Sequence, residues 1–461
     1  MCCCDSVPHL NSPSTRHING IERSAGLWQP LVVVSIFLIL ALRLFRQVSR
    51  YAVNIFFSDQ WEFNNGTLFE KHSLWEMFRW QHGTHRQGLG ALLSYFLEPH
   101  FRWNSRGEAF LAAAIVTAAA LCALYLKVRL WGPVRLFDIA IPLIFLTPAQ
   151  FESLWITPNF AHGPLPLLLI VLYCVALTRE RAVTRYVVVL IVNFLAIYTG
   201  FGLLIGFITP VWLILEYYSR NPARRPATLV FIPLALSLAS LGSFFAAYNI
   251  EPSVDCFSLL PHAPVTYVTF FLGMLAHNFG ARGSQIISLP LGAGALAAMI
   301  FVLASFGKRF KEAKSYTPES LVPAVLVAYC LLFCAATAYG RSCLGSHLAF
   351  ESRYTNYLAL GIFGLYLHSL RGQRAGKIFA GLLLAMLLTG SLKTSPADQY
   401  QMERFHEVKA NWRSCYLRIE DVEQCDQAAG FWIYRFPEPT DLKDKLEYLK
   451  QTKQNLYSDS Q

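Results

Sequence analysis

Two carboxylates follow the first long apolar stretch of the chain, in the segment FFSDQWEF. Asp59 and Glu62 lie three residues apart, with Trp61 between them. In a helical turn this spacing places both carboxylates on one side, within reach of one ligand. A carboxylate so placed can act as a general base on a hydroxyl group. A solvated acidic turn is the alternative reading, and a divalent cation shared by both carboxylates also stays open.

A basic cluster follows in the segment WQHGTHRQG. His82, His85 and Arg86 would share one face if this segment were helical. Two histidines alone are a weak zinc signal, because a catalytic zinc site needs a third ligand. We therefore interpret the cluster as a cationic site for an anionic headgroup or for the Asp59 carboxylate. Arg86 is the stronger candidate, whereas His82 fits a simple position at the membrane–water boundary nearly as well.

Two arginines near the end of the apolar region are candidates for phosphate binding. Arg353 and Tyr354 belong to the segment FESRYTNY, and Arg341 ends the preceding apolar run. A guanidinium group can bind phosphate in a bidentate manner. A salt bridge between Arg353 and Glu351 is the simpler alternative. Glu152, in FESLWITPNF, either lines an acceptor site or caps the ends of spans.

The composition is that of a membrane protein. Of 461 residues, 54% are hydrophobic and 15% are charged, whereas soluble domains carry about 25% charged residues. Apolar runs recur at the length that a membrane span requires. Ion-coupled transporters carry ionisable groups near the bilayer midplane, but Asp138 and Glu216 lie near the predicted span ends. The polar chemistry therefore favours an enzyme at the outer boundary of the membrane.

The formal charge of +10 is explained by the loops between spans, so no nucleic-acid partner is implied. Basic residues gather in alternate loops, which marks those loops as cytoplasmic. We expect an all-α polytopic protein with a cytoplasmic N-terminus, an outer C-terminus and about eleven spans. The spans are expected near residues 27–45, 108–127, 134–149, 163–178, 185–199, 201–218, 227–249, 284–306, 320–340, 355–370 and 376–391.

We expect residues 27–391 to form the membrane domain. Two segments flank this domain, and two others lie within it. Residues 1–26 form a cytoplasmic tail, and residues 46–107 form a first outer loop with amphipathic surface helices. Within that loop, Ser73 and Glu76 have the spacing of a capping box. Residues 264–280 are read as an interfacial or re-entrant piece on the outer side. Residues 392–461 form a small outer segment that packs on the outer loops.

The chain resembles the GT-C superfamily of membrane glycosyltransferases, which use polyprenyl-phosphate-linked sugars. The resemblance covers the plan of the whole chain. It is narrower for uncharacterised bacterial members with an acidic–Trp, a His–Arg and a Ser–Arg–Tyr motif, here SDQW, HGTHR and SRY. The family's acidic pair is often adjacent or one residue apart, so the wider spacing here departs from its metal-binding pattern.

The resemblance implies that Asp59 is the catalytic aspartate of an enzyme in the bacterial inner membrane. Its donor would be a polyprenyl-phosphate sugar in the lipid, and its acceptor an outer glycan, lipid or protein. A sugar leaving from phosphate needs little protonation, so one general base suffices and an arginine stabilises the departing charge. The alternatives are a non-catalytic polyprenyl-lipid carrier or flippase, and a structural subunit of an envelope-polysaccharide assembly.

Two cysteines in the C-terminal segment, Cys415 and Cys425, are its only pair. Disulfides form in oxidising compartments, so an outer position predicts that this pair is bridged. Two free thiols are the alternative.

Overall fold

The computed structural model describes residues 28–219, 227–249, 256–257, 264–280, 285–372, 374–391, 394–434 and 439–458. The proposed cytoplasmic tail of residues 1–26 lies outside these ranges. The described chain is helical apart from one two-stranded hairpin, as the all-α class requires. Ten of the eleven ranges expected as spans each fall mainly on one helix, whereas 134–149 holds the six-residue helix α6 (Ala140–Phe145) between two 3-10 turns.

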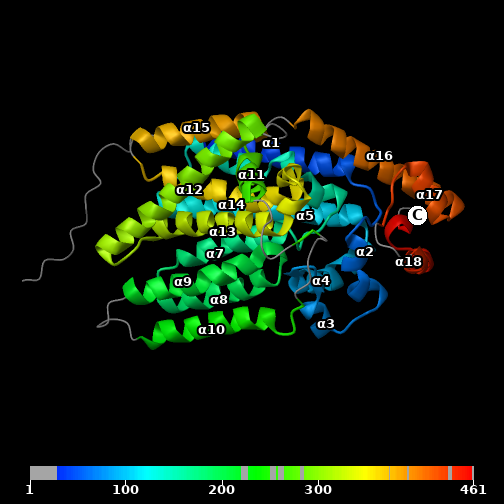
Figure 1. Ribbon diagram of the computed structural model, residues 1–461, viewed down its shortest axis with the longest axis horizontal. Helices are drawn as coiled ribbons and strands as arrows, with labels where there is room; N and C mark the ends of the chain where they lie inside the picture. The colour runs from blue at the N-terminus through cyan, green and yellow to red at the C-terminus, as the bar shows by residue number, and fades with distance from the viewer. Residues whose placement is uncertain are drawn as a thin grey trace, which may run out of the picture.

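Most of the apolar helices run side by side along the longest axis of the molecule (Figure 1). Their interior is a single apolar core, to which small residues of α5 such as Ala112, Ala119 and Ala123 give a close helix contact. These helices are α1 (Trp28–Tyr51), α5 (Ser105–Trp131), α6 (Ala140–Phe145), α7 (Pro164–Leu177), α8 (Ala182–Ile197), α9 (Leu203–Ser219), α10 (Thr228–Phe245), α12 (Gln285–Ala313), α13 (Pro318–Arg341), α14 (Thr355–Ser369) and α15 (Arg374–Ser391).

Within the described ranges, six helices are long and apolar enough to cross a membrane. Further apolar helices, among them α7 and α8, are shorter. The molecule is thus an all-α protein with the apolar helices of a membrane protein. The six are Trp28–Tyr51, Ser105–Trp131, Gly200–Ser219, Thr228–Phe245, Ile286–Ala313 and Pro318–Leu344.

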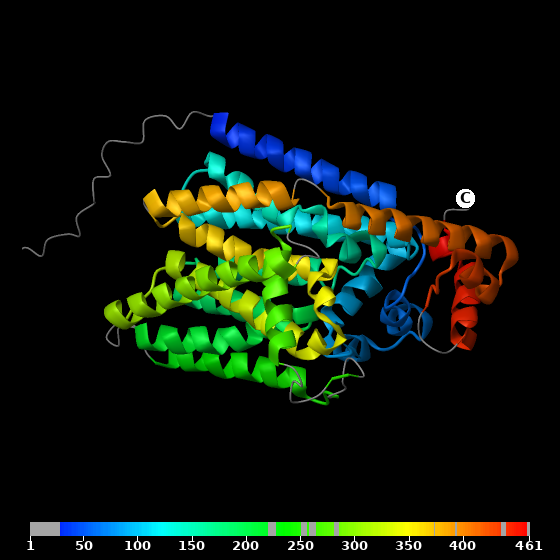
Figure 2. The ribbon, with the colours of Figure 1, turned by 45° about the horizontal axis from the view of Figure 1, so that its top comes forward.

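Helix α11 (Pro264–His277) runs across the bundle rather than along it (Figure 2). It packs against α12, α13 and the 3-10 turn Ser346–Phe350. Its 14 residues reach about 21 Å at 1.5 Å per residue, the same length as α7, so its direction and not its length distinguishes it from the other apolar helices. This orientation agrees with the interfacial or re-entrant placement expected for residues 264–280.

The polar elements gather at one end of the bundle, on the right in Figure 1. They belong to the first loop and the C-terminal segment, and the turn from α12 to α13 lies at the opposite end. The capping box of Ser73 and Glu76 is present at the start of α3. The elements are α2 (Gln60–Phe63), α3 (Leu74–Arg79), β1 (Gln81–His82), β2 (His85–Arg86), α4 (Gly88–Leu97), α16 (Pro396–Ile419), α17 (Val422–Ala429) and α18 (Pro439–Thr452).

The C-terminal segment packs on the first loop, as expected, and shares a second apolar core with it. Trp61 and Trp103 from the loop meet Trp412, Leu446 and other residues of α16 to α18 in this core. The predicted disulfide between Cys415 and Cys425 is confirmed, and it joins α16 to α17. A second disulfide joins Cys256 to Cys343, which the sequence analysis missed because 87 residues separate the two cysteines.

Candidate functional site

Asp59 is held at the start of the short helix α2 by contacts from several directions. The preceding residue, Ser58, has a left-handed backbone with φ of 51°, a conformation that costs energy in a non-glycine residue. The Ser58 amide donates to the carbonyl of Ile433 over 3.1 Å. Behind the helix, the Gln60 amide donates to Glu108 of α5 over 2.8 Å. The Asp59 side chain does not cap the helix and is 48% exposed.

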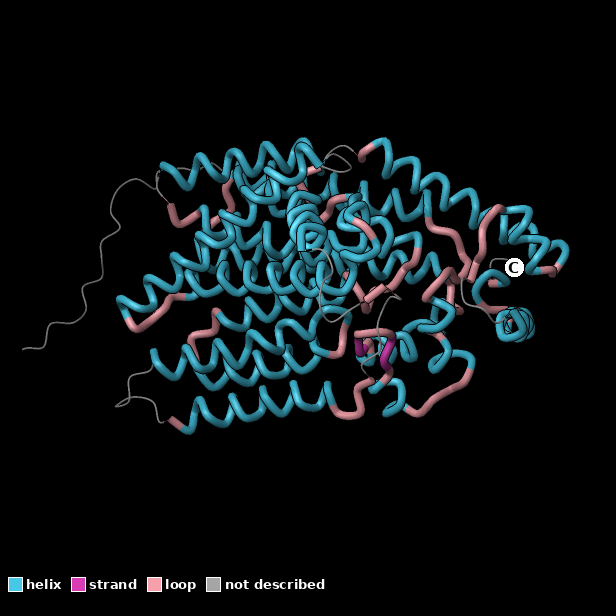
Figure 3. The backbone as a smooth tube through the Cα atoms, viewed as in Figure 1, coloured by secondary structure: helices cyan, strands magenta, loops and turns pink. Residues whose placement is uncertain are grey.

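The segment WQHGTHRQG forms a hairpin and not a helix. Strands β1 and β2 are antiparallel, with His82 opposite His85 and Gln81 opposite Arg86. The turn places Gly83 at φ of 54°, where glycine carries no steric cost. Directly opposite residues share one face of a hairpin, and neighbours along a strand face opposite ways. His82 and His85 therefore face one side, and Arg86 faces the other. Figure 3 shows the hairpin in magenta.

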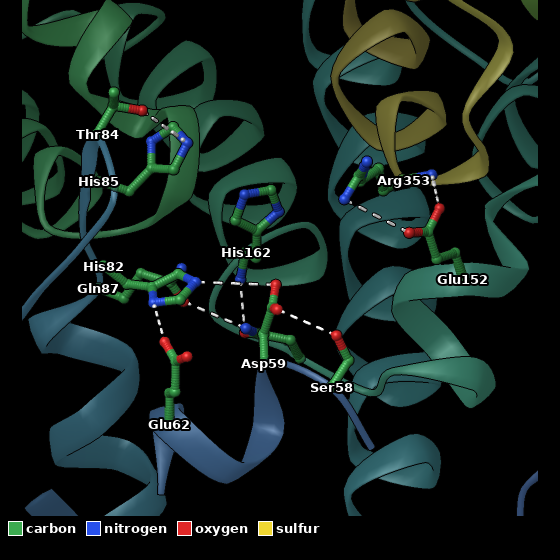
Figure 4. A network of polar contacts seen from close by, with 11 residues as sticks. Ser58, Asp59, Glu62, His82, Thr84, His85, Gln87, Glu152, His162 and Arg353 are labelled. Atoms are coloured by element: carbon green, nitrogen blue, oxygen red, sulfur yellow. Dashed lines mark hydrogen bonds and ion pairs between the residues drawn. The ribbon is translucent and has the colours of Figure 1, made fainter. Parts of the chain in front are cut away.

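His82 lies between the two carboxylates of α2 (Figure 4). Its Nδ1 is 3.1 Å from Glu62 Oε2, and its Nε2 is 3.8 Å from Asp59 Oδ2. Ser58 Oγ donates to the other Asp59 oxygen over 3.2 Å. The expected shared ligand of the two acids is thus an imidazole ring of the chain itself. We call Ser58, Asp59, Glu62 and His82 the Asp59 cluster.

Within the Asp59 cluster, Asp59 and His82 carry opposite charges at neutral pH. Contact with His82 lowers the pKa of Asp59 to about 2 against the opposing effect of burial, and the charge of Arg353 acts in the same direction. Burial alone would lower the pKa of His82, but Asp59 and Glu62 outweigh it and raise that pKa to about 9. Asp59 is therefore ionised and His82 protonated across the physiological range.

Arg86 corrects our expectation of a cationic side chain facing the acids. It is 2% exposed and donates to the backbone carbonyls of Arg79, Phe244 and Ala246 over 2.5 to 2.6 Å. Since it sits on the far face of the hairpin, it clamps the hairpin to the end of α10. Arg86 is a structural residue in this fold, and His82 takes the place we had assigned to it.

Arg353 lies in the 3-10 turn Ser352–Tyr354 and bridges two carboxylates. Its guanidinium nitrogens are 3.7 Å from Glu152 and 3.7 Å from Glu351. Its backbone amide donates to Glu152 over 3.3 Å, while its buried Nε has no hydrogen-bond partner among the described residues. The ion-pair alternative for Arg353 is thus present. It leaves part of the guanidinium unsatisfied, which is costly for a buried donor.

Arg341 and Tyr354 complete this second group, which we call the Arg353 cluster, with Glu152 and Glu351. Within the described chain the Arg341 side chain has no hydrogen-bond or ion-pair partner, and the buried hydroxyl of Tyr354 has none either. Burial and the charge of Glu152 raise the pKa of Glu351 to about 7, against the arginines. The cluster therefore has unsatisfied donors that an anion would engage.

Two buried histidines, His162 and His85, lie next to the Asp59 cluster. Burial, together with the charges of Arg353 and Arg341, lowers the pKa of His162 to about 3. Burial and nearby positive charge also lower the pKa of His85 well below its usual value. Both rings pack against Phe201, with His85 4.3 Å from it between centroids. Figure 4 shows His162 between His85 and Arg353, above Asp59. Two neutral imidazole rings packed on Phe201 thus lie next to the charged residues of the site.

In the described part of the chain, no set of three or more His, Cys, Asp or Glu side chains is arranged to hold a metal ion. Asp59 and Glu62 are the candidate cation ligands from the sequence. His82 stands between them and supplies the positive charge that a shared cation would bring.

Three residues of the site, His82, His162 and Glu351, were less prominent in the sequence. His82 belonged to the predicted cationic cluster but ranked below Arg86, and Glu351 was named only as an ion-pair partner of Arg353. His162 follows Glu152 in the same predicted outer segment, and its position in the site depends on neighbours from other segments. Searches with this chain matched no protein-family model, no curated protein and no solved structure.

Proposed function

We propose that this chain is a membrane glycosyltransferase of the bacterial inner membrane. It moves a sugar from a polyprenyl-phosphate donor to an outer glycan, lipid or protein acceptor. In this proposal the chain crosses the membrane about eleven times, with its N-terminus inside and its C-terminus outside. The observation that carries the proposal is that the half-exposed carboxylate of Asp59 and the arginine Arg353 lie in one site (Figure 4), in a chain with apolar helices long enough to cross a membrane.

The Arg353 cluster suits the phosphate of the donor. Arg353 carries two long ion pairs and an unpaired Nε, and Arg341 is without a partner in the described chain. A phosphate could occupy these donors because guanidinium groups bind its oxygens in pairs. In the transition state the same charges would stabilise the departing phosphate. Tyr354 adds a further donor for a phosphate or sugar oxygen.

Asp59 suits the acceptor. Its carboxylate is ionised and half-exposed, so it can accept a hydrogen bond from an incoming hydroxyl group. The hydroxyl becomes strongly acidic only as its bond to the sugar forms, so the proton passes to Asp59 late in the reaction. His82 keeps the carboxylate oriented and ionised. The donor phosphate would then lie at Arg353 and the acceptor at Asp59.

A specific observation favours the second candidate, a non-catalytic polyprenyl-lipid carrier. General bases work best with a pKa near the operating pH, and the pKa of Asp59 is about 2. A carboxylate and arginines that only bind a headgroup would tolerate this value. A structural subunit of an envelope assembly would need neither cluster.

The decisive experiment compares Asp59→Asn with wild type in detergent. Sugar transfer from labelled polyprenyl-phosphate sugars is measured separately from donor binding. We expect Asp59→Asn to reduce transfer roughly 100- to 10,000-fold with donor binding intact, because asparagine keeps the shape but cannot take a proton. Glu62→Gln should cost less, and Glu70→Gln, an exposed loop carboxylate, should be neutral. Full transfer by Asp59→Asn would leave the carrier or structural role.

A further inference from the structure

A hollow of about 380 Å³ opens on the far side of the hairpin from the Asp59 cluster. It lies between α3, the hairpin and the segment that follows α10, and its volume is within the usual range of about 300–1,000 Å³ for small-molecule sites. Trp75, Arg79 and Trp80 from α3 and its end line one side. Gln81 and Asn249 lie across from them.

The two indole rings differ in what they contact. Trp75 is 63% exposed, and the Arg79 guanidinium lies 5.7 Å from its ring centroid. Among the described residues, the Arg79 side chain has no hydrogen-bond or ion-pair partner. Trp80 instead stacks on His82, with 5.5 Å between ring centroids and 17° between planes. Trp80 therefore lines the hollow and also contacts the Asp59 cluster.

The frame of the hollow is preformed. The Gln81 side chain donates to the Asn249 carbonyl over 2.7 Å and accepts from the Asn249 amide over 3.2 Å. Tyr248 donates to the Thr84 carbonyl over 3.0 Å, and buried Arg86 clamps the same two segments. These bonds hold the wall in place. The Trp75 ring itself stacks on Phe78, with 6.1 Å between centroids, and is contacted by the Arg79 guanidinium, yet most of its surface stays exposed.

We propose that this hollow binds the sugar units of a glycan acceptor that lie behind its reactive end. This inference rests on the proposed glycosyltransferase function. An exposed indole face packs on the apolar C–H face of a sugar ring, since the polar handle of tryptophan stays free at its edge. Planar guanidinium and amide groups bind pairs of neighbouring hydroxyl groups. A glycan seated on Trp75 and passing Trp80 would present its next hydroxyl to Asp59.

The test measures glycan binding without any donor. Full-length protein in detergent is titrated with neutral tetrasaccharides of glucose, mannose, galactose and N-acetylglucosamine. We expect at least one to bind, and Trp75→Ala to weaken it tenfold or more. Asn249→Ala should weaken it several-fold. The matched control is Tyr400→Ala, because Tyr400 of α16 is also 63% exposed. In transfer assays, Trp75→Ala should raise KM for the tetrasaccharide acceptor. KM for a monosaccharide acceptor of the same sugar should stay unchanged, because a single unit does not reach the hollow.

The two proposals fail in different ways. Tetrasaccharide binding that depends on Trp75 in a protein without transfer activity would refute the transferase and retain the glycan site. Transfer that is indifferent to Trp75→Ala and Asn249→Ala would refute the glycan site and assign the rings to the membrane–water boundary. Absence of binding by all four tetrasaccharides to wild type would also overturn the inference.

Discussion

His82 sets the electrostatics of the site at the scale of single residues. It joins the two carboxylates of α2, and its outer face is covered by Trp80. A protonated imidazole between two carboxylates offsets the repulsion that the two acids would otherwise exert on each other. The role of His82 is to position Asp59, and its own titration makes that role testable.

We expect a dependence on pH that follows His82. Its pKa is raised to about 9 in the folded protein, so its stabilising contribution is full below about 6.5 and is lost as the pH rises through about 9. The pKa of Asp59 is lowered to about 2, so its contribution is full above about 4 and is lost as the pH falls through about 2. Glu351 of the Arg353 cluster changes charge near pH 7, so the decline that reports on His82 is the decline in transfer above pH 9. His82→Gln should remove the alkaline decline, as measured by a pH–rate profile; an unchanged decline would refute this role.

Arg353 permits a second prediction at the same scale. Arg353→Lys keeps the charge but loses the planar fork that reaches both Glu152 and Glu351. We expect a large loss of transfer and weaker donor binding. Arg341→Lys should have the smaller effect, because lysine keeps the charge and Arg341 holds no carboxylate pair through a planar fork within the described chain. Equal, mild effects in both variants would remove Arg353 from the donor site.

At the scale of elements, the end of the C-terminal segment fixes the start of the Asp59 loop. Asn455 is fully buried. Its side chain accepts from the Phe56 amide over 3.2 Å and donates to the Trp103 carbonyl over 2.7 Å and to Ser105 over 3.2 Å. The C-terminal segment is therefore part of the scaffold of the site, although it lies more than 300 residues away in the chain.

Asn455→Ala tests this scaffold. Removing the amide leaves buried backbone groups unpaired, at about 1–3 kcal/mol each, so we expect a loss of roughly 2–4 kcal/mol in the stability of the docked segment. Thermal unfolding and limited proteolysis would show an earlier transition and new cleavage in residues 394–458. Gln451→Ala, at an exposed position on α18, is the control. An unchanged melting profile for Asn455→Ala would contradict the scaffold role.

At the scale of the whole molecule, the polar elements share one end and the α12–α13 turn lies at the other (Figure 1). We expect single cysteines at Lys71 and Lys453, both exposed, to react with an impermeant maleimide in intact cells. A cysteine at exposed Lys311 should react only after the membrane is opened. Protection of the first two sites would reverse the orientation and place the site on the inner side.

Helix positions, one helix start and one disulfide could be predicted from the order of residues in the sequence. Apolar runs fixed where helices form, because a buried helix in lipid must satisfy its own backbone. Basic loops alternated with polar ones, and Ser73 with Glu76 marked a helix start by local chemistry alone. The bridge between Cys415 and Cys425 was accessible for the same reason, since ten residues separate them.

The sequence alone did not determine the partners of the charged residues. The turn at Gly83 and Thr84 made WQHGTHRQG a hairpin, and the two-residue period of a strand sent Arg86 away from the acids and His82 toward them. Glu152 and Arg353 met across 201 residues, and Asn455 met Phe56 across 399. Hydropathy and the order of charged residues are properties of the linear sequence, so they can be recognised without the fold. Which carboxylate faces which cation depends on side-chain direction after packing, so only the tertiary structure decided it.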